Sequence, residues 1–144
     1  MKHEYLILNE HNLILESFYG KMDVDGYLGF KMRQLNDPDY DSSYNVLSDL
    51  RWVEFMFPAA EMYKISDFFK ENIQLNEDRK GCLLSIDPLQ TAYSMVFKNN
   101  TSVGKVKWMV CTTLKETIQW LRLDFDEDYL SLQLREMKRK LVLV

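Results

Sequence analysis

The sequence predicts a single α/β domain with a mostly parallel sheet covered by helices. Apolar, strand-like runs alternate with helical patterns from residue 44 to residue 121, and such alternation is typical of crossover connections and a parallel sheet. Two apolar runs, 5–8 and 13–19, flank the polar, turn-prone residues 9–12, which predicts an N-terminal β-hairpin. A length of 144 residues with 47% hydrophobic residues fits one domain with a sizeable core.

A central strand, a crossover and the start of a helix are predicted within residues 44–60. An apolar, β-prone run reaches Asp49, and residues of period two continue through the following link. Pro58-Ala59-Ala60 suits the first turn of a helix, because proline needs no amide partner there. The period-two set consists of Leu47, Asp49, Val53, Phe55 and Phe57.

Helices are predicted on either side of this strand. Asp23 can cap the first by accepting hydrogen bonds from the amides of its first turn. That helix is expected to end before Pro38, because the residue before a proline avoids helical angles. Its expected buried face is Leu28, Met32 and Leu35, and that of the helix after Pro58 is Met62, Ile65 and Phe69.

Two further strand–helix units follow. Residues 81–86 form an apolar strand, and Asp87-Pro88 is a helix start with a cap and a proline at the first helical position. Residues 106–111 form the next strand, and Thr113 with Glu116 matches a capping box. The expected buried faces are Leu89, Ala92, Tyr93, Val96 and Phe97 in the first helix, and Leu114, Ile118 and Leu121 in the second.

A last helix is predicted from Glu127 to Lys140, with acidic residues first and basic residues last, as the helix dipole favours. We therefore expect a domain over residues 1–123 and a helical extension over residues 124–144. The apolar side of this helix packs either in its own subunit or against a second copy, as in a homodimer. That side consists of Tyr129, Leu130, Leu134, Met137 and Leu141.

Composition excludes several classes of partner. The net charge of −4 gives no electrostatic reason to expect nucleic acid or an anionic membrane. No uncharged apolar run is long enough to span a membrane, and acids interrupt the N-terminus where a signal peptide needs an apolar core. Cys82 and Cys111 lie in apolar runs and are expected to be buried, reduced thiols, so a cytoplasmic location is predicted.

Several short motifs follow the order and spacing of a known family. They are Asn12-Leu13-Ile14, Asp37-Pro38, Leu47-Ser48-Asp49 with the following Leu50, Val53 and Phe55-Met56, and Thr117-Ile118-Gln119-Trp120-Leu121. Together, over about Glu4 to Leu121, the chain resembles the STAS fold of SpoIIAA-type anti-sigma-factor antagonists. It resembles more closely the bacterial SpoIIAA-like proteins of unassigned function. The resemblance implies a binding or regulatory domain.

The resemblance also implies that a regulatory switch is missing. The antagonists carry a phosphorylatable serine in an Asp-Ser-Ser-Gly turn at the helix start after the central strand. Aligned on Phe55-Met56, those positions hold Phe57-Pro58-Ala59-Ala60. The nearest hydroxyls, Ser48 and Ser66, do not lie at the helix start, so phosphorylation at this turn is not expected.

A candidate surface is expected at the carboxyl edge of the sheet, where open α/β folds bind ligands. Asp49 is predicted to contact Arg51 or the backbone, and a ligand contact is its alternative role. The aromatic and apolar residues nearby could hold a protein partner or an apolar small molecule, or the C-terminal helix could cover them. The candidate residues are Asp49, Arg51, Trp52, Phe55, Met56, Phe57 and Asp87.

No metal, cofactor or catalytic group is expected. His3 and His11 lack partners at ligand spacing, and Ser85 and Ser94 have no histidine nearby in sequence to serve as base. The sequence therefore predicts a non-enzymatic domain that binds a protein partner. A carrier of a lipid or other apolar ligand is the alternative, and an enzyme is the least favoured hypothesis.

Overall fold

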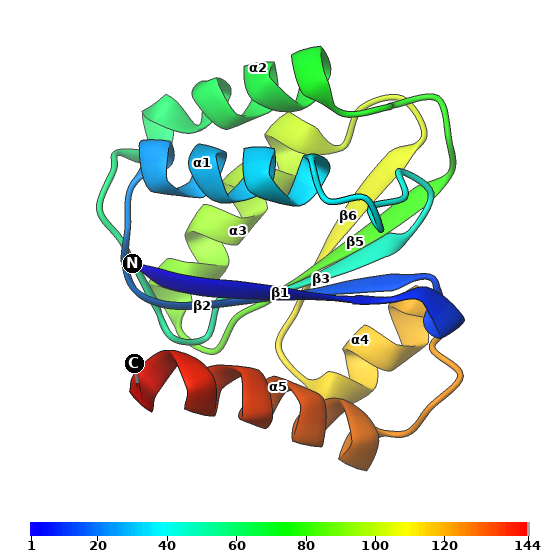
Figure 1. The fold of residues 1–144 in the computed structure, drawn as a ribbon. Helices are drawn as coiled ribbons and strands as arrows, with labels where there is room; N and C mark the ends of the chain where they lie inside the picture. The colour runs from blue at the N-terminus through cyan, green and yellow to red at the C-terminus, as the bar shows by residue number, and fades with distance from the viewer. Residues whose placement is uncertain (144) are drawn as a thin grey trace.

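A six-stranded mixed sheet forms the middle layer of the protein (Figure 1). The computed structural model describes residues 1–143, so Val144, the last residue of the expected extension, lies outside the described residues. The strand order is β1-β2-β3-β5-β6, and β4 pairs with β2. The strands are β1 (Lys2–Leu8), β2 (Leu13–Met22), β3 (Asn45–Asp49), β4 (Val53–Phe55), β5 (Arg79–Leu84) and β6 (Val106–Cys111).

The pairing confirms both the hairpin and the parallel sheet predicted from sequence. β1 is antiparallel to β2, and the short 3-10 helix η1 (Asn9–His11) joins them with Asn12 at a positive φ of 50°. Every other pair, β2 with β3 and β4, β3 with β5, and β5 with β6, is parallel. The fold is therefore α/β with one antiparallel edge strand.

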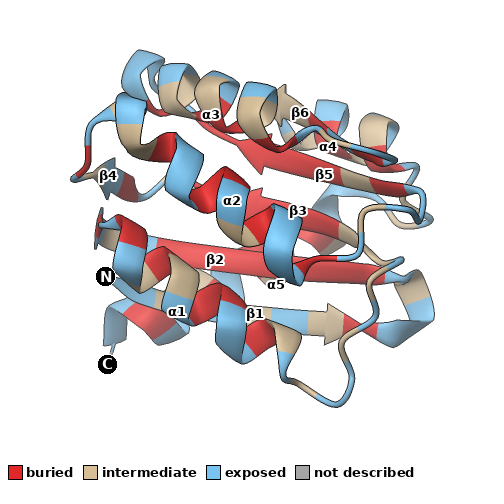
Figure 2. Ribbon diagram, turned by 90° about the horizontal axis from the view of Figure 1, so that it is seen from above, coloured by how far each residue is buried: buried red, intermediate tan, exposed pale blue. Residues whose placement is uncertain are grey.

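Helices cover both faces of the sheet (Figure 1). One face carries α1 (Val24–Leu35), α2 (Tyr63–Asn72) and α3 (Pro88–Thr101), and the other carries α4 (Leu114–Leu121) and α5 (Glu127–Leu143). The central strands β2, β3 and β5 are largely buried, whereas the edge strand β1 and the outer helix faces are more exposed (Figure 2). Each face has its own cluster of buried apolar side chains. We call the cluster under α1, α2 and α3 the upper core and the cluster under α4 and α5 the lower core.

The C-terminal helix packs within its own chain. Leu130 and Leu134 of α5 are buried together with Leu13 and Leu15 of β2, and α5 runs beneath β1 and β2 beside α4 (Figure 1). The segment expected as an extension therefore forms part of the layer that closes the lower core. Of the two predicted alternatives, the apolar side of the helix therefore packs in its own subunit.

The link after β3 differs from the predicted crossover. The chain turns at Leu50, whose carbonyl accepts from the Val53 amide at 3.2 Å, and then forms β4. β2 is ten residues long and β3 only five, so β2 extends past β3 and offers its far end to β4. A 3-10 helix, η2 (Ala59–Met62), follows Pro58, and the α-helix begins only at Tyr63.

The predicted buried faces of α1 and α3 are confirmed only in part: Phe97 is buried, and Leu28, Leu35, Tyr93 and Val96 are half-buried against the core. In α1, Met32 is 40% exposed, and in α3, Leu89 is 60% exposed. Polar side chains occupy much of both buried faces, which are Val24, Tyr27, Phe30, Lys31 and Gln34 in α1 and Gln90, Ser94, Phe97 and Thr101 in α3. Apolar spacing alone could not predict faces that contain hydrogen-bonded polar groups. In α2, by contrast, Met62, Ile65 and Phe69 are buried as predicted.

A carboxylate lies at the centre of the upper core. Glu16 of β2 is fully buried and accepts from Lys31 Nζ at 2.5 Å and from Gln34 Nε2 at 2.8 Å. Its other oxygen accepts from the hydroxyl of Ser48, the residue opposite it on β3. These hydrogen bonds satisfy the carboxylate and tie α1 to two neighbouring strands. Burial lowers the pKa of Lys31, and the charge of Glu16 opposes this shift.

The Glu16 contacts predict a strong dependence on Lys31. Lys31→Met leaves a buried carboxylate without its cation, so we expect the free energy of unfolding to fall by about 3–5 kcal/mol. Chemical denaturation of both proteins measures this difference. Lys64→Met, which removes the exposed Lys64–Glu61 pair, is the matched control and should change stability little. Equal effects of the two substitutions would contradict the assigned role of Glu16.

The two cysteines provide a second test. Cys82 and Cys111 are free and fully buried, and a hydrogen bond to Cys111 together with burial raises the pKa of Cys82. A thiol reagent must reach the sulfur, and both cysteines are buried, so we expect slow labelling of the folded protein and complete labelling in denaturant. Rapid reaction of either thiol in native buffer would show that the lower core opens readily.

Candidate functional site

Two turns meet at the carboxyl edge of the sheet. One is the β3–β4 turn, residues 50–52, and the other is the β5–α3 turn, residues 85–87. The Leu50 amide donates to the carbonyl of Leu84 at 2.9 Å, so the two turns are joined where the strands end. The candidate residues predicted from sequence lie on or next to these turns.

Gln90 locks the two turns together. Its side chain is almost fully buried, and Nε2 donates to the carbonyls of Arg51 at 2.9 Å and Val53 at 3.2 Å. Its Oε1 accepts from the amides of Ile86 at 3.0 Å and Asp87 at 3.4 Å. Asp87, a predicted site residue, in turn accepts from the Gln90 amide at 2.7 Å and completes a capping box.

Asp49 is a structural residue in this arrangement. It is fully buried and accepts two hydrogen bonds from the Arg51 guanidinium, each 2.9 Å long, and one from the Arg51 amide at 3.2 Å. Hydrogen bonds to this carboxylate raise the pKa of Arg51. The predicted contact between Asp49 and Arg51 is therefore confirmed, and it fixes the β3–β4 turn.

Four exposed apolar side chains lie on or beside the joined turns. Trp52 in the β3–β4 turn is 36% exposed, and Met56, just after β4, is 51% exposed. Ile86 in the β5–α3 turn is 56% exposed, and Leu89, in the first turn of α3, is 60% exposed. We call these four residues the edge platform. Sequence reasoning identified Trp52 and Met56 but missed Ile86, and it assigned Leu89 to the core. Leu89 lies outside because Gln90 and Ser94 take the buried side of α3, which no signal in the sequence indicates.

Two cations flank the Trp52 ring. The Arg51 guanidinium carbon lies 5.7 Å from the ring centre, and the Lys138 ammonium of α5 lies 3.2 Å from it. Such cation–π contacts restrict the indole. The C-terminal helix therefore braces one side of Trp52 without covering the edge platform.

Two of the predicted surface residues are not available to a partner. Phe57 is only 6% exposed and belongs to the upper core, so the apolar surface expected along 52–57 is interrupted. Phe55 is half-buried and stacks on Tyr93, with ring centres 4.6 Å apart and nearly parallel planes. The reason is strand geometry, because alternate side chains around β4 point toward α3.

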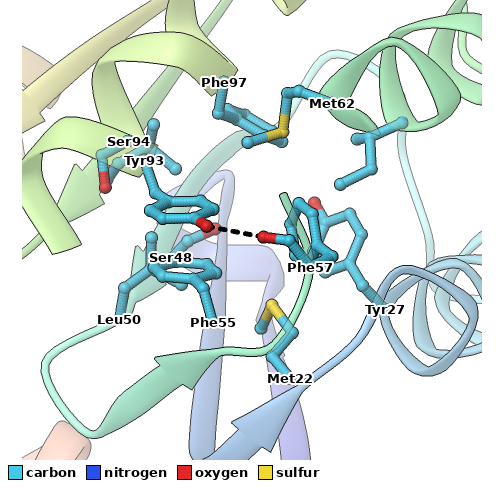
Figure 3. A pocket seen from close by; sticks show the side chains of 12 residues that line it. Met22, Tyr27, Ser48, Leu50, Phe55, Phe57, Met62, Tyr93, Ser94 and Phe97 are labelled. Atoms are coloured by element: carbon cyan, nitrogen blue, oxygen red, sulfur yellow. Dashed lines mark hydrogen bonds between the residues drawn. The ribbon is translucent and has the colours of Figure 1, made fainter. Parts of the chain in front are cut away.

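A small apolar cavity lies behind the edge platform (Figure 3). It encloses about 20 Å³, room for about one water molecule. At its rim the Tyr93 hydroxyl donates to the carbonyl of Phe57 at 2.6 Å (Figure 3). The lining residues are Met22, Tyr27, Ser48, Leu50, Phe55, Phe57, Met62, Ile65, Leu83, Tyr93, Ser94 and Phe97.

The hydroxyls nearest the α2 start are engaged inside the protein. Ser48 is 2% exposed and donates to Glu16, and Ser66 is 5% exposed and donates to the carbonyl of Asn100 at 2.9 Å. Pro58 and Ala59 occupy the start itself. Neither serine is presented to a modifying enzyme in this fold.

Within residues 1–143, no three His, Cys, Asp or Glu side chains gather as a metal site. No helix in the same range combines the length and apolar character needed to cross a membrane. The sequence matches neither a protein-family model nor a curated protein.

The role of Gln90 can be measured directly. Gln90→Met removes both sets of hydrogen bonds, and leaves buried carbonyls unpaired, so we expect a loss of about 1–3 kcal/mol in the free energy of unfolding. Gln119→Met, on the exposed side of α4, is the control and should lie within about 0.5 kcal/mol of the parent. A fully stable Gln90→Met protein would show that the two turns do not depend on this side chain.

Proposed function

We propose that the protein is a non-enzymatic binding domain that engages a protein partner through the edge platform. The observation that carries this proposal is the pairing of exposed apolar side chains with a rigid base. Trp52, Met56, Ile86 and Leu89 are exposed, whereas the turns beneath them are held by Gln90 and by the Asp49–Arg51 pair. Large apolar side chains on a preorganised surface lose little entropy on binding and are typical anchors of protein interfaces.

The order of elements supports a relation to SpoIIAA-like proteins with a STAS fold. An N-terminal hairpin, a helix and then parallel strand–helix units match the expectation from the short motifs. In this reading the edge platform adjoins the α2 start, where the related antagonists carry their phosphoserine. Because Pro58 and Ala59 replace the serine turn, binding by this protein is constitutive. A cytoplasmic location fits its free thiols.

The second candidate function is transport of a lipid or other apolar ligand. The apolar cavity behind the edge platform favours it, and Met22 and Met62 give that cavity adaptable walls. Its volume of about 20 Å³ is far below the several hundred Å³ of typical ligand pockets. A carrier role would therefore require the cavity to expand, whereas partner binding uses the platform as it stands.

Affinity capture of a partner by the parent protein and by a variant of the edge platform tests the proposal. The tagged parent protein and the double variant Trp52→Glu/Met56→Glu are incubated with lysate of the source cells, and a photo-crosslinking residue at position 56 maps the contact. We expect one protein to be retained in stoichiometric amount by the parent, to crosslink at position 56, and to be lost with the double variant. Charges at two apolar anchors should weaken binding by at least about a hundredfold.

Met32→Glu provides the control, since Met32 is exposed to a similar extent on α1, outside the edge platform. It should retain the partner as the parent does. Partner retention by the double variant, or equal loss with Met32→Glu, would contradict the assignment of the surface. A ligand of lipid mass on the purified protein in native mass spectrometry, with no partner captured, would favour the carrier function instead.

A further inference from the structure

The outward face of α5 carries an ordered stripe of side chains. Asp128, Leu132, Arg135 and Arg139 follow one another at intervals of four, three and four residues, so they lie on one side of the helix. All four are exposed, and Leu132 is 49% exposed. They lie opposite the buried side of the same helix, which consists of Leu130, Leu134, Met137 and Leu141.

Charge along this stripe changes sign from one end to the other. Asp128 lies in the first turn, whereas Arg139 lies toward the C-terminal end, and both are exposed. The helix dipole accounts for this order within one helix. It does not account for a half-exposed leucine between the two charged ends. The spacing of four, three and four places Leu132 between Asp128 and Arg139 along one line, where a second helix could contact all three.

This surface is complementary in charge to a second copy of itself that is rotated by 180°. Two α5 helices laid side by side in parallel would place acid against acid and base against base. Laid antiparallel about a two-fold axis, they place the acidic end of each against the basic end of the other. A two-fold interface of this kind uses one patch on both subunits, so one sequence supplies both halves.

We propose that a second copy of this chain docks on α5 in antiparallel fashion. Asp128 then faces Arg139 of the partner subunit, and the two-fold axis repeats this contact between Arg139 and Asp128 of the partner subunit. Leu132 packs beside the aliphatic part of Arg135 of the partner subunit near the two-fold axis. Arg139 gives up only an exposed contact with Glu136, 3.0 Å long, and such surface pairs contribute little.

The size of the helix limits the strength of this association. A helix of 17 residues is about 26 Å long, and two such helices bury less area than a standard protein interface. We therefore expect a reversible dimer with a Kd of about 10–500 μM at low ionic strength. Because the flanking contacts are exposed ion pairs, salt should weaken the dimer.

Sedimentation equilibrium of the full chain tests the proposal through charge reversal. The parent protein should change from monomer to dimer mass between about 10 and 500 μM. Asp128→Arg and Arg139→Asp should each weaken self-association by about tenfold or more, because like charges then face each other at both symmetric contacts. An equimolar mixture of the two variants should associate again, since opposite charges meet at both contacts.

The controls separate this inference from unfolding and from partner binding. Both positions are exposed, and circular dichroism should show each variant folded. Glu71→Arg, a reversal at an exposed site on α2, should dimerise like the parent. A parent that stays monomeric, a dimer that survives either reversal, or a mixture that fails to associate would each overturn the proposal. Trp52→Glu/Met56→Glu leaves α5 unchanged and should still dimerise, so this result is independent of the proposed function.

Discussion

The buried carboxylate of Glu16 is the constraint on which the upper half of the protein depends. It lies among apolar side chains, where an unpaired charge would cost several kcal/mol, and it is tolerated because Lys31, Gln34 and Ser48 donate to it. These donors come from α1 and β3, so the cost of burying the charge is offset only when α1 sits in one position over β2 and β3. Apolar packing by itself would permit neighbouring positions, and the polar contacts select one.

The same principle operates at the carboxyl edge, with consequences for function. Gln90 joins two turns through four hydrogen bonds, and the Asp49–Arg51 pair fixes one of them. Loops at the ends of strands are ordinarily the mobile parts of an α/β domain. Here the polar contacts face inward and leave the apolar side chains of the edge platform facing solvent. The proposed partner surface requires a rigid base of this kind.

Sequence reasoning predicted the parts of the fold that local chemistry determines. Asp23, Asp87 and Thr113 cap helices as expected, because a cap and its amides are neighbours in sequence. The polar members of the buried faces of α1 and α3 could not be predicted, since Lys31 and Gln90 are buried only because distant residues satisfy them. β4 was missed for a similar reason, as its partner is the far end of β2. At the site, Asp49 with Arg51 was found because they are two residues apart, whereas Ile86 and Leu89 became visible only once Gln90 was located.

Amide hydrogen exchange of the β3–β4 turn tests most directly whether the edge platform has a rigid base. The amides of Leu50, Val53 and Met56 donate to the carbonyls of Leu84, Leu50 and Met22. A locked turn predicts that these three amides exchange slowly, with opening free energies close to that of the strands of the core. Exchange at the rate of an open loop, while the amides of β3 and β5 remain protected, would show that the turn moves independently and would contradict a preformed binding surface.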